Sequence, residues 1–328
     1  MIVSKTPLRC SFFGGGTDFA GYYENSKYGY GTVLSTALNM YVYIMVCKRF
    51  DHKIRVCYRI QEMVDSVDEI QHNIVREAMK IVGITGGIDI VYSADIPMST
   101  SGVGLASSSA FAVGVLNALF AYQGKRVSAN DLAKLACEIE IVRLGNPIGI
   151  QDQYAVANGG FRQYKFWPTG EVTHTIITGG SSYLRELRRN LMLYYTGQTR
   201  ISSNILSEQE RNIQDKTPVL DKMVQMTETA CTELGKGAIG RIGEMLDEAW
   251  QLKKQMASKI SNPEIDRMYA LAKENGALGG KILGAGGGGF MLLYVQPECQ
   301  VKVKKAMQEY RQVEFDFEPE GSRIIFAE

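Results

Sequence analysis

The stretch from Asp95 to Tyr122, DIPMSTSGVGLASSSAFAVGVLNALFAY, constrains the fold more than any other part of the chain. It begins with small residues, broken by Pro97, Gly102 and Gly104, and from about Leu105 it continues as an apolar segment of helical length. Its large apolar residues recur at helical spacing: Phe111, Val115, Leu116, Leu119 and Phe120. The pattern predicts a loop that passes directly into a helix with one buried face.

The first turn of this predicted helix carries Ser107, Ser108 and Ser109. Free backbone N–H groups and the positive end of the helix dipole favour an anion at such a position. The preceding glycines let the backbone approach an anion closely, and the hydroxyls add donors and a candidate metal ligand. The stretch therefore favours phosphate binding. Because serine is also a common helix cap, a serine-capped core helix is an alternative that the stretch alone leaves open.

Composition and charge exclude several classes of function. The 328 residues contain 36 basic and 35 acidic side chains, a formal net charge of +1, which argues against nucleic-acid binding. There is no run of about 18 apolar residues and no secretion signal, so we expect a soluble, cytoplasmic protein without a membrane partner. The six cysteines form no C-x-x-C pair and the three histidines lie far apart, so we expect neither disulfides nor a zinc site.

A second glycine-rich stretch lies near the amino terminus. Residues 2–13 predict a strand that leads into the three glycines of residues 14–16, followed by Thr17 and Asp18. Arg9 and Asp18 lie on either side of this turn, so a cation and a carboxylate can both approach a ligand at the glycines. A plain hairpin turn with an Asx-type hydrogen bond is the alternative.

Regular elements are expected between the first glycine-rich stretch and the serines at residues 107–109. Residues 31–60, rich in Val, Tyr and Ile, predict antiparallel strands joined by a turn. Residues 69–82 predict an amphipathic helix that ends at Gly83. Residues 88–92 predict a strand that leads into the central loop, as expected for a phosphate cradle.

Two carboxylates follow within a short distance of one another. Glu140 lies near the end of a helix predicted over residues 128–143. The next segment, residues 145–160, has two glycines and a proline in its first half, which predicts an irregular loop that presents Asp152. A solvated helix face for Glu140 and a helix cap for Asp152 are the alternatives.

Composition changes near residue 185, from strand-rich before it to helix-rich after it. Strands are predicted at residues 160–166 and 171–178. Three long helices are predicted at residues 216–234, 238–258 and 263–275. We therefore predict two domains, residues 1–185 and residues 186–328.

The third glycine-rich stretch is KILGAGGGGFMLLYV, residues 281–295. Gly284, Gly286 and Gly289 match G-x-G-x-x-G, the dinucleotide fingerprint, but that motif requires a helix directly after the glycines. Here FMLLYV predicts a strand, so the glycines form a hairpin connection instead. The P-loop pattern G-x-x-x-x-G-K-[ST] is absent from the sequence.

Together, in this order, the three stretches resemble the motifs of the GHMP kinase superfamily. The matching segments are TPLRCSFFGGGTD at 6–18, PMSTSGVGLASSSA at 97–110 and KILGAGGGGF at 281–290. The resemblance implies a two-lobed α+β fold, with a strand-rich amino-terminal ATP-binding domain and a helix-rich carboxyl-terminal domain. One departure is Ala106, where the family usually has glycine; a methyl group there costs little unless the residue needs a positive φ.

The resemblance also implies roles for individual residues. Asp152 is expected to accept the proton of the acceptor hydroxyl, and Arg9 to keep Asp152 ionised and stabilise charge on the transferring phosphoryl group. Ser108 and Glu140 are expected to hold Mg²⁺, which prefers oxygen ligands and needs few from the protein. The ATP phosphates are assigned to the central loop, which comprises Ser101, Gly102, Val103, Gly104, Leu105, Ala106, Ser107 and Ser108.

Within the superfamily, residues 14–18 and 31–44 look most like the kinases that act on the anomeric position of sugars, particularly D-glycero-D-manno-heptose 7-phosphate kinases. This implies ATP-dependent phosphorylation at C1, a step toward nucleotide-activated heptose, with Thr199 and Arg200 binding the substrate's own phosphate. The other expected substrate contacts are Gly15, Gly16, Thr17, Asp18, Gly286 and Gly287. A fucose-type or galactose-type kinase and a non-catalytic sugar sensor are the alternatives, and the oligomeric state, monomer or homodimer, stays open.

Overall fold

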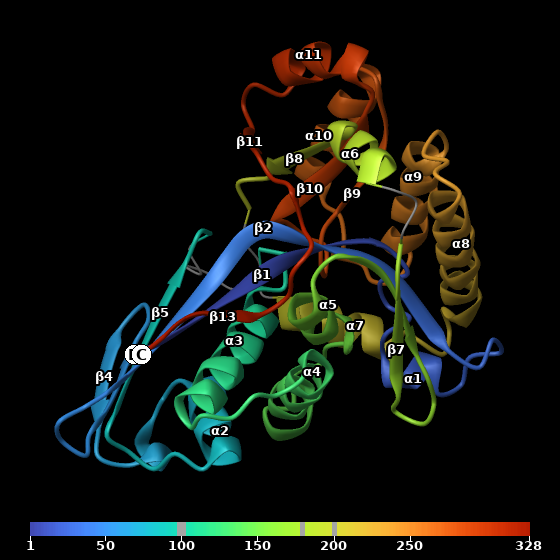
Figure 1. Ribbon diagram of the computed structural model, residues 1–328. Helices are drawn as coiled ribbons and strands as arrows, with labels where there is room; N and C mark the ends of the chain where they lie inside the picture. Colours follow the sequence, from blue (N-terminus) through green and yellow to red (C-terminus); the bar gives the residue numbers. More distant parts are fainter. Residues whose placement is uncertain (97–102, 178–180, 199–201) are drawn as a thin grey trace.

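The computed structural model describes residues 1–96, 103–177, 181–198 and 202–328. These residues form two β-sheets with helices packed on them, so the predicted α+β class is confirmed. In Figure 1 the long strands β1 and β2 cross the centre of the molecule. Helices α2 to α5 lie on one side of them, and the second sheet with α6, α10 and α11 lies on the other.

The first sheet is built on β1 and β2, which pair antiparallel from Ile2↔Val46 to Phe13↔Leu34. The strand order is β13-β1-β2-β5-β3-β4, with β6 and β12 also paired to β2 and β7 paired to β6. Its strands are β1 (Ile2–Phe13), β2 (Gly31–Lys48), β3 (Ile54–Cys57), β4 (Gln61–Val64), β5 (Ile88–Ala94), β6 (Phe161–Phe166), β7 (Val172–Ile176), β12 (Phe317–Glu318) and β13 (Arg323–Ala327). The strand predicted at residues 2–13 is thereby confirmed.

The pairing of β2 and β3 differs from the expectation for residues 31–60. A turn does join them, but β5 lies between them, antiparallel to β2 and parallel to β3. Ile88 and Ile90 of β5 are almost completely buried, so this apolar strand is stabilised by a partner on each side. The sequence pattern therefore predicted the strands correctly but the pairing between them wrongly.

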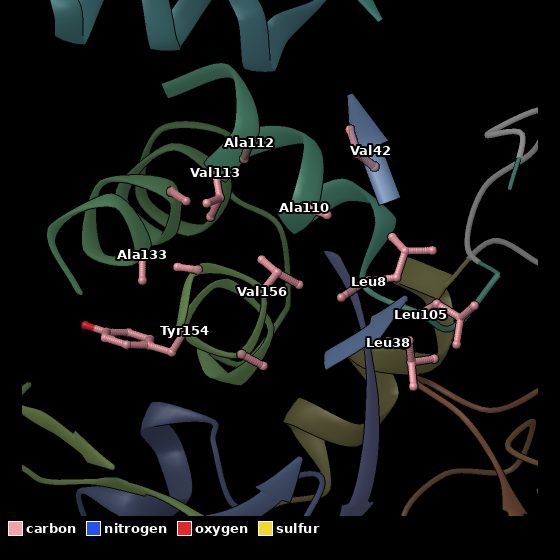
Figure 2. Packing of buried hydrophobic residues seen from close by; sticks show 14 of the residues in the cluster. Leu8, Leu38, Val42, Leu105, Ala110, Ala112, Val113, Ala133, Tyr154 and Val156 are labelled. Atoms are coloured by element: carbon pink, nitrogen blue, oxygen red, sulfur yellow. The ribbon is translucent and has the colours of Figure 1, made fainter. Parts of the chain in front are cut away.

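Helices α2, α4 and α5 pack around α3, which begins at Ser107 as the sequence predicted, whereas Tyr22 of α1 is buried in a second apolar cluster. Figure 2 shows side chains of α3, α4 and α5 in one apolar cluster with Leu8 and Leu38 of the central strands. Helix α2 ends at Gly83, whose φ of 79° is the left-handed stop expected there. These helices are α1 (Ala20–Tyr23), α2 (Asn73–Val82), α3 (Ser107–Tyr122), α4 (Ala129–Cys137) and α5 (Gln151–Asn158), with a short 3₁₀ turn, η1 (Val67–Glu69), before α2.

Two local predictions in this lobe need correction. The helix expected over residues 128–143 changes at Glu138 into a π-helical turn, η2 (Glu138–Arg143). The irregular loop expected over residues 145–160 contains helix α5 from Gln151 onward. Tyr154, Ala155, Val156 and Ala157 are buried there, so burial against α3 and α4 outweighs the local effect of the preceding glycines and proline.

The second sheet has the order β11-β8-β10-β9, and β9 and β10 form the predicted hairpin around the third glycine stretch. Its strands are β8 (Leu191–Tyr195), β9 (Ala277–Ile282), β10 (Phe290–Val295) and β11 (Arg311–Val313). The helices of this part of the chain are α6 (Ser181–Arg189), α7 (Ser202–Arg211), α8 (Thr217–Gly235), α9 (Ile242–Lys254), α10 (Pro263–Glu274) and α11 (Pro297–Ala306). Helices α9, α10 and α11 contact β9 or β10, whereas α8 packs against α9 and against β1 and β2 of the first sheet. The last strands, β12 and β13, belong to the first sheet. The domain border near residue 185 stays a prediction. No helix within the described ranges is long and apolar enough to cross a membrane.

Candidate active site

Arg9 and Asp152 form a bidentate ion pair between β1 and α5. Nε and Nη2 of Arg9 donate to Oδ1 and Oδ2 of Asp152, each at 2.8 Å. The third guanidinium nitrogen, Nη1, donates to the backbone oxygen of Gly104 at 2.6 Å. The Arg9 side chain is 4% exposed and that of Asp152 is 24% exposed, so the carboxylate is the more accessible partner. The two residues predicted as catalytic are therefore in contact, and Arg9 links them to the central loop.

Glu140 lies in the π-helical turn η2, which places its carboxylate beside the serines in the first turn of α3. Oε1 accepts a hydrogen bond from Ser108 Oγ at 2.5 Å, and Oε2 accepts from Ser109 Oγ at 2.8 Å and from Gln153 Nε2 at 2.7 Å. Burial raises the pKa of the Glu140 carboxyl, although the three hydrogen bonds counteract this effect. The sequence anticipated the approach of Ser108 and Glu140 but missed Ser109 and Gln153 as the residues that hold the carboxylate.

The oxygens of Ser108 and Glu140 fit a Mg²⁺ ion. A hydroxyl and a carboxylate are hard ligands, and Mg²⁺ typically takes only one or two ligands from the protein and the rest from water and phosphate. Among the described residues, no group of three or more His, Cys, Asp and Glu side chains could hold a metal ion. No cation of the described chain pairs with the buried Glu140 carboxylate, so a metal ion would supply the missing positive charge.

The described part of the central loop, from residue 103 onward, leads directly into the first turn of α3. Leu105 and Val103 are buried and anchor it, Ser108 is exposed, and the Ser107 Oγ is buried without a hydrogen-bond partner among the described residues. The free N–H groups of the first turn of α3 lie beside these hydroxyls. Two residues assigned to the ATP phosphates, Ser101 and Gly102, lie outside the described residues.

Ala106, the residue before α3, has the only positive φ among the described non-glycine residues, 62°. The condition under which the missing glycine matters is therefore met, because alanine in the left-handed region is strained by about 1–2 kcal/mol.

Ala106→Gly is expected to leave stability unchanged or raise it by up to about 1 kcal/mol, since relief of strain exceeds or balances the added entropy of the unfolded chain. The matched control is Ala112→Gly in the buried interior of α3, which is expected to destabilise by about 1 kcal/mol or more. Urea unfolding of the three proteins measures both changes. Equal destabilisation by the two substitutions would contradict the strain at Ala106.

The first glycine turn forms one wall of a cavity with about 530 Å³ of empty space, open solvent at its mouth included. Asp18 lies in this wall, where Oδ1 accepts from the Gly16 backbone N–H at 2.9 Å and Oδ2 from that of Gln151 at 3.3 Å. Burial raises the pKa of the Asp18 carboxyl, and the nearby charge of Asp152 acts in the same direction. The cavity is lined by Arg9, Ser11, Gly15, Gly16, Asp18, Phe19, Ile148, Gly149, Gln151, Asp152, Leu206, Lys253, Lys281, Gly284 and Ala285.

Three of the predicted substrate residues, Thr17, Gly286 and Gly287, are not among the residues that line this cavity. The Thr17 side chain is fully buried, and its hydroxyl donates to the backbone oxygens of Gly14 and Thr32, both at 2.8 Å. Gly286 and Gly287 pack against Ile260, which accepts the Gly287 N–H at 2.7 Å. Their roles in binding stay predictions, as do those of Thr199 and Arg200, which lie outside the described residues.

The third glycine stretch meets the second at Gly284, whose φ is 71°. A Cβ at Gly284 would lie 2.7 Å from the Cα of Gly104. This contact places the glycines of the second lobe against the central loop of the first, so stretches nearly two hundred residues apart border one site.

Two buried lysines of the cavity were not anticipated from the sequence. Lys253 is the penultimate residue of α9, and Lys281 lies in β9. Lys281 is the first residue of the third glycine-rich stretch, a position that offered a weak signal. Lys253 is followed by a second lysine, Lys254, at the end of a helix, where a solvated pair is the ordinary expectation, so no sequence signal distinguished it.

Comparisons with known proteins agree with this geometry. Residues 70–160 match the description "GHMP kinases N terminal domain", and residues 230–311 match "GHMP kinases C terminal". A D-glycero-alpha-D-manno-heptose 7-phosphate kinase from Campylobacter jejuni is 31% identical to this chain over 98% of it and 97% of that protein.

Two solved structures share the fold. A D-glycero-D-manno-heptose 1-phosphate kinase from Bacteroides thetaiotaomicron has a TM-score of 0.82 at 23% identity and covers 100% of both chains. Galactokinase from Lactococcus lactis, solved with galactose, has a TM-score of 0.75 at 19% identity and covers 98% of this chain and 94% of its own. At these identities the two structures establish the fold alone.

The fold and the site define a kinase that transfers a phosphoryl group to a hydroxyl. The chain belongs to the GHMP kinase family, whose phosphate donor is ATP.

Proposed function

We propose that this kinase phosphorylates the anomeric C1 hydroxyl of D-glycero-D-manno-heptose 7-phosphate, for the synthesis of nucleotide-activated heptose. The observation that carries the proposal is the Arg9–Asp152 pair, which opens into the cavity beside Asp18 and lies next to the loop that precedes α3. The full-length similarity to a heptose 7-phosphate kinase supports this choice of acceptor.

Different residues of the site bind the phosphate donor and the acceptor. The first turn of α3 binds the ATP phosphates through backbone N–H groups and the hydroxyls of Ser107 and Ser108. Ser108 and Glu140 hold Mg²⁺, which when bound offsets negative charge on the phosphates. Asp18 lies where its carboxylate can accept hydrogen bonds from hydroxyls of the sugar.

Asp152 accepts the proton of the attacking hydroxyl, and Arg9 keeps the carboxylate oriented. The bidentate geometry fixes both carboxylate oxygens, so the remaining lone pairs point in defined directions. Arg9 also brings positive charge to the point where negative charge develops on the transferring group. Most of the rate enhancement then comes from positioning and electrostatics, as in other phosphoryl transfers.

An ADP-release assay with a panel of acceptors tests the proposal. The kcat/KM for heptose 7-phosphate is expected to exceed that for free fucose and free galactose by at least about a hundredfold, because the enzyme must recognise both the sugar and the phosphate of the acceptor. Phosphorus NMR of the product identifies C1 as the modified position. Preferential turnover of fucose or galactose would replace the proposal with the alternative kinase, and binding without turnover would favour a sensor.

A further inference from the structure

Lys253 and Lys281 extend from different elements of the second lobe into the acceptor cavity. Each residue is 6% exposed, and both line the cavity together with Arg9, Asp18 and Asp152. Two buried ammonium groups in one cavity are rare, since an unpaired buried charge is costly. The presence of two such groups in this cavity therefore needs a functional explanation.

The hydrogen-bond partners of both lysines are neutral. Lys281 Nζ donates to the backbone oxygen of Phe12 at 3.0 Å. Lys253 Nζ donates to Gln209 Oε1 at 2.6 Å and to the backbone oxygen of Gly15 at 3.4 Å. These contacts orient the two ammonium groups without neutralising them, and each group has N–H donors that make no hydrogen bond to the described residues.

The carboxylates of the cavity are engaged elsewhere. Asp152 is held by Arg9 on both oxygens, and Asp18 accepts backbone N–H groups on both of its own. In the described part of the chain no carboxylate oxygen lies within 4.0 Å of either lysine nitrogen. The pair thus lacks an anion of its own.

The pKa values of both lysines are lowered, as expected for buried ammonium groups without a paired carboxylate. Burial lowers the pKa of Lys253 to about 8 and that of Lys281 to about 7. Arg9 lowers both, and Lys253 lowers the pKa of Lys281, whereas Asp18 and Asp152 counteract the effect at Lys253 and Cys10 at Lys281. Near pH 8 the two lysines together therefore carry less than their full positive charge.

We propose that Lys253 and Lys281 bind the phosphate group that the acceptor already carries, and so select a phosphorylated sugar over a free one. The inference rests on the proposed function, because it concerns the same cavity. Two ammonium groups match the charge of a phosphate monoester dianion, whereas the hydroxyls of a free sugar need only hydrogen bonds. The transferring phosphoryl group has its own partners in Arg9, Ser108 and the first turn of α3.

Calorimetric titration of the unaltered protein tests the proposal without any substitution. Heptose 7-phosphate is titrated at pH 8, without nucleotide, in two buffers that differ in ionisation enthalpy. Binding is expected to take up protons, since the bound dianion recharges the lysines. Inorganic phosphate is the second probe and is expected to compete with the sugar phosphate. Absence of proton uptake, together with equal affinity for the dephosphorylated heptose, would overturn the proposal.

Lys253→Met and Lys281→Met separate the two lysines from the rest of the site. Each is expected to raise KM for heptose 7-phosphate about ten- to hundredfold, as for loss of a charged hydrogen bond, with little change in affinity for a non-hydrolysable ATP analogue. Lys254→Met is the matched control, because Lys254 follows on the same helix and faces Asp266 at 3.8 Å. A fall in kcat with unchanged KM would instead assign the lysines to the transferring phosphoryl group and contradict the proposal.

The outcomes distinguish this inference from the proposed function. If another sugar phosphate is the better acceptor and still depends on the lysines, the choice of heptose is wrong and the lysine site stands. If heptose 7-phosphate is the acceptor but both methionine variants retain its KM, the function stands and the lysine site is wrong.

Discussion

Asp152→Asn is expected to lower kcat by about a hundredfold to ten-thousandfold, the usual contribution of a positioned general base. Asparagine keeps the shape of the side chain, and its oxygen can still accept a hydrogen bond from Arg9, but the amide cannot take up the acceptor proton. The first turn of α3 does not depend on this carboxylate, so affinity for a non-hydrolysable ATP analogue is expected to stay nearly the same. Steady-state kinetics and calorimetry measure the two quantities.

Asp65→Asn serves as the control for this substitution, because Asp65 is exposed and distant from the cavity. Thermal unfolding shows whether the variant at residue 152 is folded, since Arg9 loses its charged partner and stability is expected to fall. A folded Asp152→Asn protein with full activity would remove Asp152 from proton transfer and restrict it to orienting Arg9.

Glu140→Gln is expected to reduce kcat/KM on the order of a hundredfold at low Mg²⁺ concentration, because an electrostatic contact to the phosphates through the metal is lost. The stability of the metal-free protein, in contrast, is expected to stay the same or to increase. Burial raises the folded-state pKa of Glu140, so the group stabilises the fold at low pH, and this stability is lost as pH rises through the folded pKa. Near neutral pH the neutral glutamine avoids this cost, so the metal-free variant is expected to unfold at an equal or higher temperature.

Glu138→Gln is the matched control for Glu140→Gln. Glu138 lies in the same π-helical turn, but its carboxylate is on the surface and pairs with Arg143 at 2.7 Å. Kinetics across a Mg²⁺ series and unfolding temperatures with and without Mg²⁺ check both substitutions. The same Mg²⁺ dependence in Glu140→Gln and in the unaltered enzyme would exclude Glu140 as a metal ligand.

Elements with strong local signals could be predicted from the sequence. The apolar spacing of α3, the glycine after α2 and the strand before Gly14 are properties of neighbouring residues, and the structure confirms each of them. Helix α5 could not be predicted in the same way. Its buried residues are stabilised by α3 and α4, which are distant in sequence, while its own first residues follow glycine and proline.

The site was predicted in part for the same physical reason. Arg9 and Ser108 belong to the motifs, the resemblance to the family pointed to Asp152 and Glu140, and the structure brings the four residues together in the two predicted pairs. Lys253 has no such signature, because only the packing of α9 against the first lobe reveals that it is buried. The insertion of β5 between β2 and β3 likewise depends on pairing between segments that are remote in the sequence.

The contact between Gly284 and Gly104 has a mechanical consequence for the reaction cycle. Because the two backbones touch without intervening side chains, neither hairpin nor loop can shift toward the other, and a displacement of one pushes directly on its neighbour. Arg9, which donates to the Gly104 oxygen, is part of the same rigid junction. A side chain at Gly284 would force the loop and the hairpin apart at this point, and because Gly284 also lines the cavity, the shape of that cavity would change with it.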